Sequence, residues 1–249
     1  MENPNPTKYE LHQEKKLAQL TEERRAKAWR KTRRLIVWLT AGAILVGIIF
    51  AVNYSFSSRG GGGVSPLSSK AEEILKPKAD DWVIGDPKTA KLVLIEYSDF
   101  ECPACAVYYP LTKRLLTEFP GQLAFIYRHY PWSFHLHAKE ASIVAEAAGR
   151  QGKFWEMVTL LFTEQERWAK ATKAGPIFSE YATKLGLDQS QFQTDLSNPA
   201  LVVRVQRDLD EANAINVTYT PAFFLGTKLI DNPRSYDDFK SLIQKNLSR

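Results

Sequence analysis

The chain has 249 residues, 44% of them hydrophobic, so it is long enough to fold around one or two packed cores. Its 13 glycines, 13 prolines and two cysteines exclude collagen-like, low-complexity and disulfide-framework proteins. The net charge of +5 arises in residues 1–34, which hold ten Lys and Arg against five Asp and Glu, whereas the rest of the chain holds 23 of each. Because the basic excess is confined to one end, we expect no nucleic-acid partner.

An apolar run of 18 residues, Leu35–Val52, follows the basic segment and contains Thr40 as its one polar residue. This length is close to the roughly 20 residues that cross a bilayer core. Basic side chains concentrate on its N-terminal side, so the positive-inside rule places the N-terminus in the cytoplasm. We therefore expect a basic cytoplasmic tail at residues 1–34 and a transmembrane signal anchor at residues 35–53. A cleaved signal peptide is the alternative, but its charged N-terminal region would be unusually long.

Residues 54–79 contain the stretch SFSSRGGGGVSPLSS, whose Gly and Ser content is typical of a flexible tether. Random-coil scaling gives a tether of about 20 residues a reach of about 25 Å. A domain that follows it would stay close to the membrane, on the extracytoplasmic side.

Strand and helix patterns alternate from residue 80 onward, which indicates an α/β domain at residues 80–249. Residues 82–84 can form a short strand. KLVLIEY, at residues 91–97, has the continuous apolar run of a central strand that is covered on both faces. QLAFIYRHY, at residues 122–130, is the next strand, and the two longer strands with the helix between them predict a right-handed βαβ unit.

The helix of this unit begins near Cys102, with Pro103 suited to the first helical position, and ends before Pro120. Apolar residues recur at every fourth position and are expected to form its buried stripe: Val107, Leu111, Leu115 and Phe119.

The pattern then becomes helical for about 65 residues. Apolar spacing predicts helices around residues 141–148, 154–161 and 178–185, a short helix from Asp188 and a longer one from Pro199. Strands follow at residues 222–225 and 228–230, joined by a turn at Gly226, and a last helix begins after Ser235. We therefore place an all-helical insertion at about residues 133–197 inside the α/β domain.

The chain's two cysteines, Cys102 and Cys105, lie where the central strand passes into a helix N-terminus. Unpaired N–H groups and the helix dipole favour an anion there, so we expect Cys102 to ionise readily and act as a nucleophile. Cys105, one turn later and deeper, is placed to attack a mixed disulfide at Cys102. An inert disulfide or half of a zinc site is the alternative, but a closed zinc site takes about four ligands and the chain has no second cysteine pair.

Three segments, IEYSDFECPAC, AEAAGRQGKFWEM and TPAFFL, resemble the DsbA-like branch of the thioredoxin superfamily. The resemblance implies a thioredoxin fold interrupted by a helical insertion. It also implies a cis-proline that faces the two cysteines, which Pro221 matches, and a preceding residue, Thr220, that pairs with extended substrate through its backbone. The chemistry belongs to the cysteines themselves, so we expect neither a cofactor nor a metal.

Glu96 follows the apolar run of the expected central strand, six positions before Cys102, where the family carries an acidic residue. Burial would raise its pKa towards neutrality, where it could exchange protons with Cys105. A strand-end carboxylate that reaches solvent is the alternative. Asp99 and Glu101 are expected on an exposed loop.

Two features depart from the family pattern. Tyr219 stands where members often have glycine, so its ring is expected to overhang Cys102 and narrow the range of substrates. Pro103 and Ala104, between the cysteines, are not the Pro-His pair of the most oxidising members, so we expect a potential between about −270 mV, as in thioredoxin, and about −120 mV, as in DsbA. The expected substrate-binding residues are Pro103, Ala104, Tyr219, Thr220 and Pro221.

Other candidate residues have ordinary interpretations. His129, His135 and His137 lie close in sequence, but they are expected to be loop or core residues rather than zinc ligands. Five aromatic residues are expected mainly in the core of the insertion, some of them bordering the cysteines: Trp132, Phe134, Phe154, Trp155 and Phe162.

These features predict a membrane-anchored, extracytoplasmic thiol:disulfide oxidoreductase in a bacterial cell membrane. We expect an oxidase that donates the Cys102–Cys105 disulfide to secreted or membrane proteins with thiols and is reoxidised by a membrane redox partner. A reductase or isomerase on the same fold is one alternative, and a non-catalytic binding module with a structural disulfide is another.

Overall fold

The structure is a computed structural model that describes residues 69–248. The predicted cytoplasmic tail, the predicted transmembrane anchor and the tether up to residue 68 lie outside the described residues. Within residues 69–248, no helix combines the length and the apolar character that a membrane span requires.

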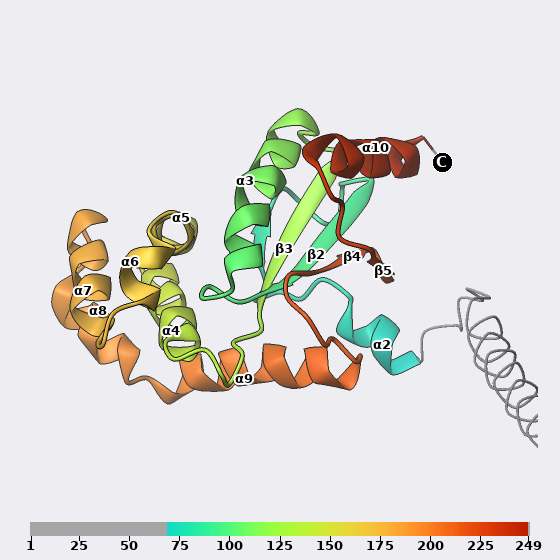
Figure 1. Ribbon diagram of the computed structural model, residues 1–249. Coiled ribbons are helices and arrows are strands. Elements are labelled where there is room, and N and C mark those ends of the chain that lie inside the picture. The colour runs from blue at the N-terminus through green and yellow to red at the C-terminus, as the bar shows by residue number, and fades with distance from the viewer. Residues whose placement is uncertain (1–68, 249) are drawn as a thin grey trace, which may run out of the picture. The chain divides into compact units, whose positions relative to one another are not determined.

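A five-stranded sheet with strand order β1-β3-β2-β4-β5 forms the centre of the domain (Figure 1). β2 (Leu92–Ser98) pairs in parallel with β3 (Leu123–His129), and the other neighbouring strands are antiparallel. The remaining strands are β1 (Trp82–Ile84), β4 (Ala222–Leu225) and β5 (Lys228–Ile230). Helix α3 (Pro103–Glu118) connects the parallel pair, which confirms the predicted βαβ unit.

Both faces of the sheet are covered, which explains the continuous apolar run of β2. Leu94 packs into the larger core with α3, α10 (Tyr236–Leu247) and the helical insertion. Ile95, which points to the opposite face, packs into a smaller core that includes residues of α9 (Pro199–Ala214). In Figure 1, α3 lies along one side of the sheet, α9 crosses below it, and the insertion gathers at one end.

The insertion consists of five helices between β3 and α9, and it confirms the predicted mixed α/β fold with a helical insertion. They are α4 (Ala138–Gly149), α5 (Phe154–Thr163), α6 (Gln165–Ala169), α7 (Gly175–Lys184) and α8 (Gln189–Leu196). Trp82 of β1 stacks on Phe154 with ring centroids 4.1 Å apart and lies so close to Gly149 that a Cβ there would meet the indole at 2.4 Å. This contact fixes the insertion against the sheet edge.

The expected buried stripe of α3 is wrong at its N-terminal end. Val107 is 64% exposed, whereas the buried residues of α3 are Cys105, Thr112 and Leu115. A spacing of four residues drifts by about 40° at each step around a helix, so Val107 and Phe119 cannot share a face.

The predicted tether extends too far towards the C-terminus. Within the range assigned to it, α2 (Ser69–Ile74) is helical, and Ile74 and Leu75 are buried. Arg128, fully buried in β3, holds this segment: it binds the Asp81 carboxylate through two nitrogens and donates to the carbonyls of Ile74 (2.6 Å) and Lys76 (2.9 Å). Sequence composition gave no sign of this long-range anchor.

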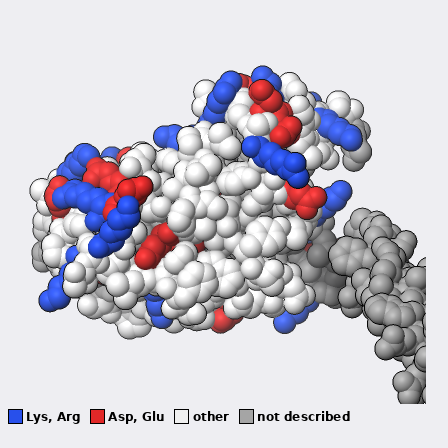
Figure 2. All heavy atoms as spheres, in the orientation of Figure 1, with Lys and Arg blue, Asp and Glu red and all other residues white. Residues whose placement is uncertain are grey.

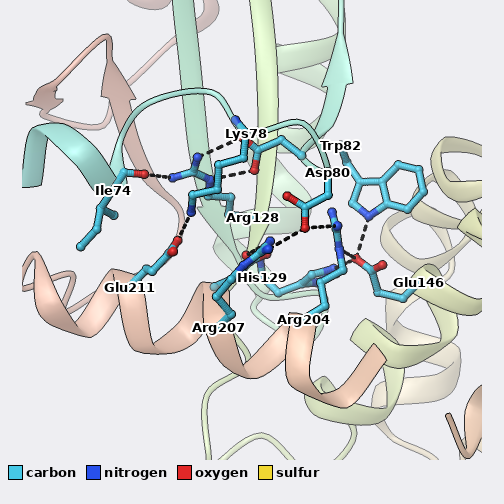
Figure 3. Close-up of polar contacts among 12 residues, drawn as sticks. Ile74, Lys78, Asp80, Trp82, Arg128, His129, Glu146, Arg204, Arg207 and Glu211 are labelled. Atoms are coloured by element: carbon cyan, nitrogen blue, oxygen red, sulfur yellow. Dashed lines mark hydrogen bonds and ion pairs between the residues drawn. The ribbon is translucent and has the colours of Figure 1, made fainter. Parts of the chain in front are cut away.

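A buried carboxylate on α4 joins the insertion to the rest of the domain (Figure 3). Glu146 Oε1 lies 2.6 Å from Trp82 Nε1, 2.8 Å from His129 Nε2 and 2.7 Å from Arg204 Nε. These partners come from β1, β3 and α9 respectively. Burial acts to raise the pKa of Glu146, but the surrounding hydrogen bonds and positive charges outweigh it and hold the pKa below its ordinary value. One carboxylate therefore fastens four elements together.

Glu146→Ala should lower the free energy of unfolding by about 3 kcal/mol, because it leaves buried donors without an acceptor. Glu146→Gln should cost less, since its amide oxygen still accepts. Glu166→Ala, which removes a carboxylate that is 86% exposed and paired with Lys170, is the control and should leave stability unchanged. Urea unfolding of the full chain checks the order of these losses, and similar midpoints for Glu146→Ala and Glu166→Ala would contradict it.

Candidate active site

The first cysteine occupies the position at which β2 passes into α3. Cys102 is the residue that precedes the helix, with an extended backbone (φ −72°, ψ 120°), and Pro103 is at the start of the helix. Proline is favoured there because the first helical N–H has no partner within the helix. The Cys102 sulfur consequently lies beside the free N–H groups of the first turn.

The structure brings the two cysteines and the predicted cis-proline loop together. Cys102 Sγ donates to the Thr220 carbonyl oxygen at 3.5 Å, and the Thr220–Pro221 peptide bond is cis, as the family resemblance implied. Cys105 is fully buried, and its sulfur accepts from the Asp99 N–H at 3.5 Å. Both cysteines are free thiols in the structure.

The two thiols differ in acidity in the direction that the sequence predicts. A hydrogen bond from the Cys105 thiol, helped by the Thr220 side chain and by the backbone N–H groups of Cys105 and Ala104, lowers the pKa of Cys102 to about 5 against the effect of burial. Burial makes the largest contribution that raises the pKa of Cys105. The interaction with Cys102 and the negative charge of Glu96 raise it further. At neutral pH the pair therefore holds one thiolate, on Cys102.

Glu96 is buried, with 4% of its surface exposed, so the solvent-exposed alternative is wrong. It alternates along β2 with Ile95, which faces the smaller core, and therefore lies on the α3 side of the sheet. Burial raises its pKa to about 7; the nearby Ser98 side chain acts against this shift, and the negative charge of Cys102 adds to it. It lines a cavity of about 100 Å³ together with Thr112 of α3 and Trp155 of α5.

The expectation that Asp99 lies on an exposed loop is wrong, because the segment after β3 folds over it. Asp99 is fully buried and accepts hydrogen bonds from the backbone N–H groups of Glu101 (2.7 Å) and Trp132 (2.8 Å) and from His135 Nδ1 (2.7 Å). Glu101 in turn accepts from the His137 N–H at 2.6 Å. Two carboxylates thus fasten the segment after β3 to the cysteine loop.

The three histidines have separate partners: His129 contacts Glu146, His135 contacts Asp99, and His137 contacts the carbonyl oxygen of Ala171. Within residues 69–248, no group of three or more His, Cys, Asp or Glu residues is arranged to hold a metal ion.

Two polar residues hold the site together through contacts that the sequence did not predict. Gln165, in α6 of the insertion, donates from one amide nitrogen to the carbonyls of Phe100 (2.7 Å) and Cys102 (2.9 Å). Trp132, expected in the insertion core, donates from Nε1 to Thr220 Oγ1 at 2.9 Å. A lone Gln or Trp far along the chain carries no motif, so no local signal could have identified either contact.

Three of the five predicted substrate-binding residues lie at an accessible surface, whereas Thr220 is half-buried and Pro221 is buried. Pro103, Ala104 and Tyr219 are exposed, and Tyr219 directly precedes Thr220. In the segment after β3, Phe134 and Leu136 are 72% and 75% exposed. Figure 2 shows that charged side chains are sparse on the face that includes the lower end of α3. That the Tyr219 ring overhangs Cys102 remains a prediction.

Selective alkylation tests the assignment of the two thiols. In the reduced full chain, iodoacetamide should modify Cys102 with a half-maximal rate near its pKa of about 5, while buried Cys105 stays unmodified at mildly acidic pH. Cys105→Ser should retain the labelling and Cys102→Ser should lose it. Equal modification of both cysteines would contradict the assignment.

Comparison with known proteins agrees with this geometry. The chain is similar in fold to α-DsbA1 of Wolbachia pipientis, with a TM-score of 0.63 and 21% identity over 72% of this chain and 96% of that one. It is also similar to BdbD of Bacillus subtilis, with a TM-score of 0.59 and 21% identity over 67% and 92% of the two chains. At these identities the likeness concerns the fold.

In sequence, the chain is 35% identical over 188 residues to a Na(+)/H(+) antiporter NhaA of Herminiimonas arsenicoxydans. The match covers 73% of this chain but 29% of the antiporter. Because the chain spans less than a third of such relatives, their name assigns it no activity. A thioredoxin family model matches residues 78–245, which include both cysteines and the cis-proline. The chain therefore belongs to the thioredoxin family, with the fold of its DsbA-like members.

Proposed function

We propose that the protein is a thiol:disulfide oxidase that donates the Cys102–Cys105 disulfide to secreted or membrane proteins. The observation that carries the proposal is the asymmetry of the two thiols, since Cys102 has a pKa of about 5 whereas that of buried Cys105 is raised. A protein that stabilises its own thiolate favours its reduced form, and therefore passes its disulfide to other thiols.

The proposed reaction has two exchange steps. A substrate thiolate attacks Cys102 Sγ, forms a mixed disulfide and expels the sulfur of Cys105, which takes up a proton. A second substrate thiolate then attacks the mixed disulfide and releases Cys102 as the stabilised thiolate. The substrate loses an electron pair and two protons, and the dithiol holds the electrons until a membrane redox partner reoxidises it.

Glu96 would exchange protons with the buried Cys105 thiol. Its pKa of about 7 allows it to donate and accept near neutral pH, and its charge already influences Cys105. The substrate would lie along the Thr220–Pro221 segment and pair with the Thr220 backbone, against the exposed surface of Pro103 and Ala104. Tyr219 would limit which side chains fit.

The location of the enzyme is part of the proposal. The apolar run at residues 35–52 and the basic segment before it support a single-pass anchor with the N-terminus in the cytoplasm. The catalytic domain would then act outside the cytoplasm of a bacterial cell, where disulfides persist.

Glu96→Gln tests the proton exchange. The variant should fold but turn over more slowly, and the dependence of its rate on pH should flatten around the pKa of about 7 that the carboxyl group supplies. Glu118→Gln, at the far end of α3, is a control that should keep the original pH profile. An unchanged profile in Glu96→Gln would remove Glu96 from the mechanism.

The stability of the two redox states tests the direction of the reaction. A disulfide normally stabilises a fold by restraining the unfolded chain, but here the reduced full chain should melt at a higher temperature than the oxidised one at neutral pH. The pKa of Cys102 is lowered in the folded state. The thiolate therefore stabilises the reduced fold fully above an ordinary thiol pKa of about 8.5, and this stabilisation is lost as the pH falls through about 5.

The advantage of the reduced form should therefore shrink as the pH is lowered towards 5. Cys102→Ala provides the control, since its melting temperature should not respond to reductant. An oxidised form that melts higher at neutral pH would favour a reductase instead.

A further inference from the structure

We propose that Asn232 and Tyr108 are positioning residues for polypeptide substrates: through the connection between β5 and α10 they hold the Thr220–Pro221 segment at a fixed place beside α3. The inference rests on the proposed pairing of an extended substrate with the Thr220 backbone. It concerns how a polypeptide is held at the site, and it leaves the chemistry of the two thiols unchanged.

The Thr220–Pro221 segment lies just before β4 and lacks the support of strand pairing. β4 begins at Ala222, which pairs with Tyr97 at the end of the β2–β4 register. Proline has no backbone N–H, so the carbonyl oxygen is the backbone group through which Pro221 can form a hydrogen bond. Asn232 Nδ2 donates to that oxygen at 2.8 Å. A side chain thus supplies the support that strand pairing provides within β4.

The connection that carries Asn232 is also fastened to α3. Pro233, the next residue, is buried, and its carbonyl oxygen accepts from the Tyr108 hydroxyl at 2.7 Å. The Tyr108 ring also packs against Phe223 of β4, with the ring centroids 5.5 Å apart. Two adjacent residues therefore link the segment before β4, on one side, to the helix that follows Cys102, on the other.

A second observation indicates that Asn232 serves more than stability. Its Oδ1 atom is buried and has no hydrogen-bond partner within residues 69–248. A buried acceptor without a partner lowers stability, and native structures contain few of them. The polar amide is therefore explained by what Nδ2 holds in place, and its unpaired oxygen is a stability cost of the kind that functional sites carry.

The linkage should matter for a polypeptide and not for a small thiol. An extended substrate gains main-chain hydrogen bonds to Thr220 only if that backbone lies within hydrogen-bonding distance and angle. A segment that is fixed in advance need not be ordered when the substrate binds, so binding is tighter. A small dithiol has to reach only Cys102, and it makes no use of the Thr220 backbone.

The experiment compares two reductants of the oxidised full chain in single-turnover kinetics: dithiothreitol, and a reduced peptide with two cysteines in an unstructured sequence. Asn232→Ala should raise the peptide concentration that gives half the maximal rate by about fivefold, the effect of one lost hydrogen bond. The maximal rate with peptide and the rate with dithiothreitol should stay the same. The melting temperature should change little, because the substitution also removes the unpaired Oδ1.

Two further variants extend the comparison. Tyr108→Phe, which removes only the hydroxyl, should also raise the half-saturating peptide concentration. Combined with Asn232→Ala, it should raise that concentration by less than the product of the two single effects, since both act through one connection. Asn232→Asp keeps the shape of the side chain but cannot donate when ionised, and it replaces Asn232→Ala if that variant fails to fold.

The matched controls remove similar contacts elsewhere. Asn246 Nδ2 donates to the Leu242 carbonyl within α10 at 2.8 Å, and the Tyr109 hydroxyl lies 2.6 Å from Thr159 Oγ1 on the insertion side of α3. Asn246→Ala and Tyr109→Phe should both leave the half-saturating peptide concentration unchanged.

An unchanged half-saturating concentration in Asn232→Ala, or equal losses with peptide and with dithiothreitol, would overturn the inference and leave the proposed function intact. If the wild-type chain oxidised dithiothreitol but not the peptide, the proposed function would be contradicted, and the inference with it.

Discussion

The pairing of β2 with β4 is the constraint on which the site depends. Tyr97, near the end of β2, pairs with Ala222, at the start of antiparallel β4, so the chain leaving one strand and the chain entering the other meet at one edge of the sheet. Cys102 lies in the chain that leaves β2, and Pro221 lies in the chain that enters β4. Neither the thiolate at the helix N-terminus nor the Thr220 carbonyl opposite it would be in place without this register.

The helical insertion supports the site as well as covering the sheet. Gln165 binds the carbonyls of the cysteine loop from α6, and Asp99 binds the segment that leads into α4. Glu146 fastens α4 itself to β1, β3 and α9. A change deep in the insertion can therefore reach Cys102 through a few hydrogen bonds, and Gln165, which donates to the Cys102 carbonyl, makes the most direct of them.

Local patterns in the sequence were enough to place the strands, most of the helices and the cysteine pair, because strand runs and a proline at a helix start are short-range features. The burial of Glu96 followed from its position in a strand covered on both faces. Asp99 and Trp132 could not be placed in this way, since their roles depend on residues more than 30 positions away. The exposure of Val107 shows the opposite error, in which a regular spacing was taken for a buried face.

The equilibrium redox potential of the full chain against glutathione tests the central claim most directly. The nucleophile's pKa of about 5 lies between about 7 for thioredoxin and about 3.5 for DsbA, whose potentials are about −270 and −120 mV. We therefore predict a potential between these values, roughly −200 to −170 mV. A potential at or below about −270 mV would contradict the oxidase and indicate a reductant instead.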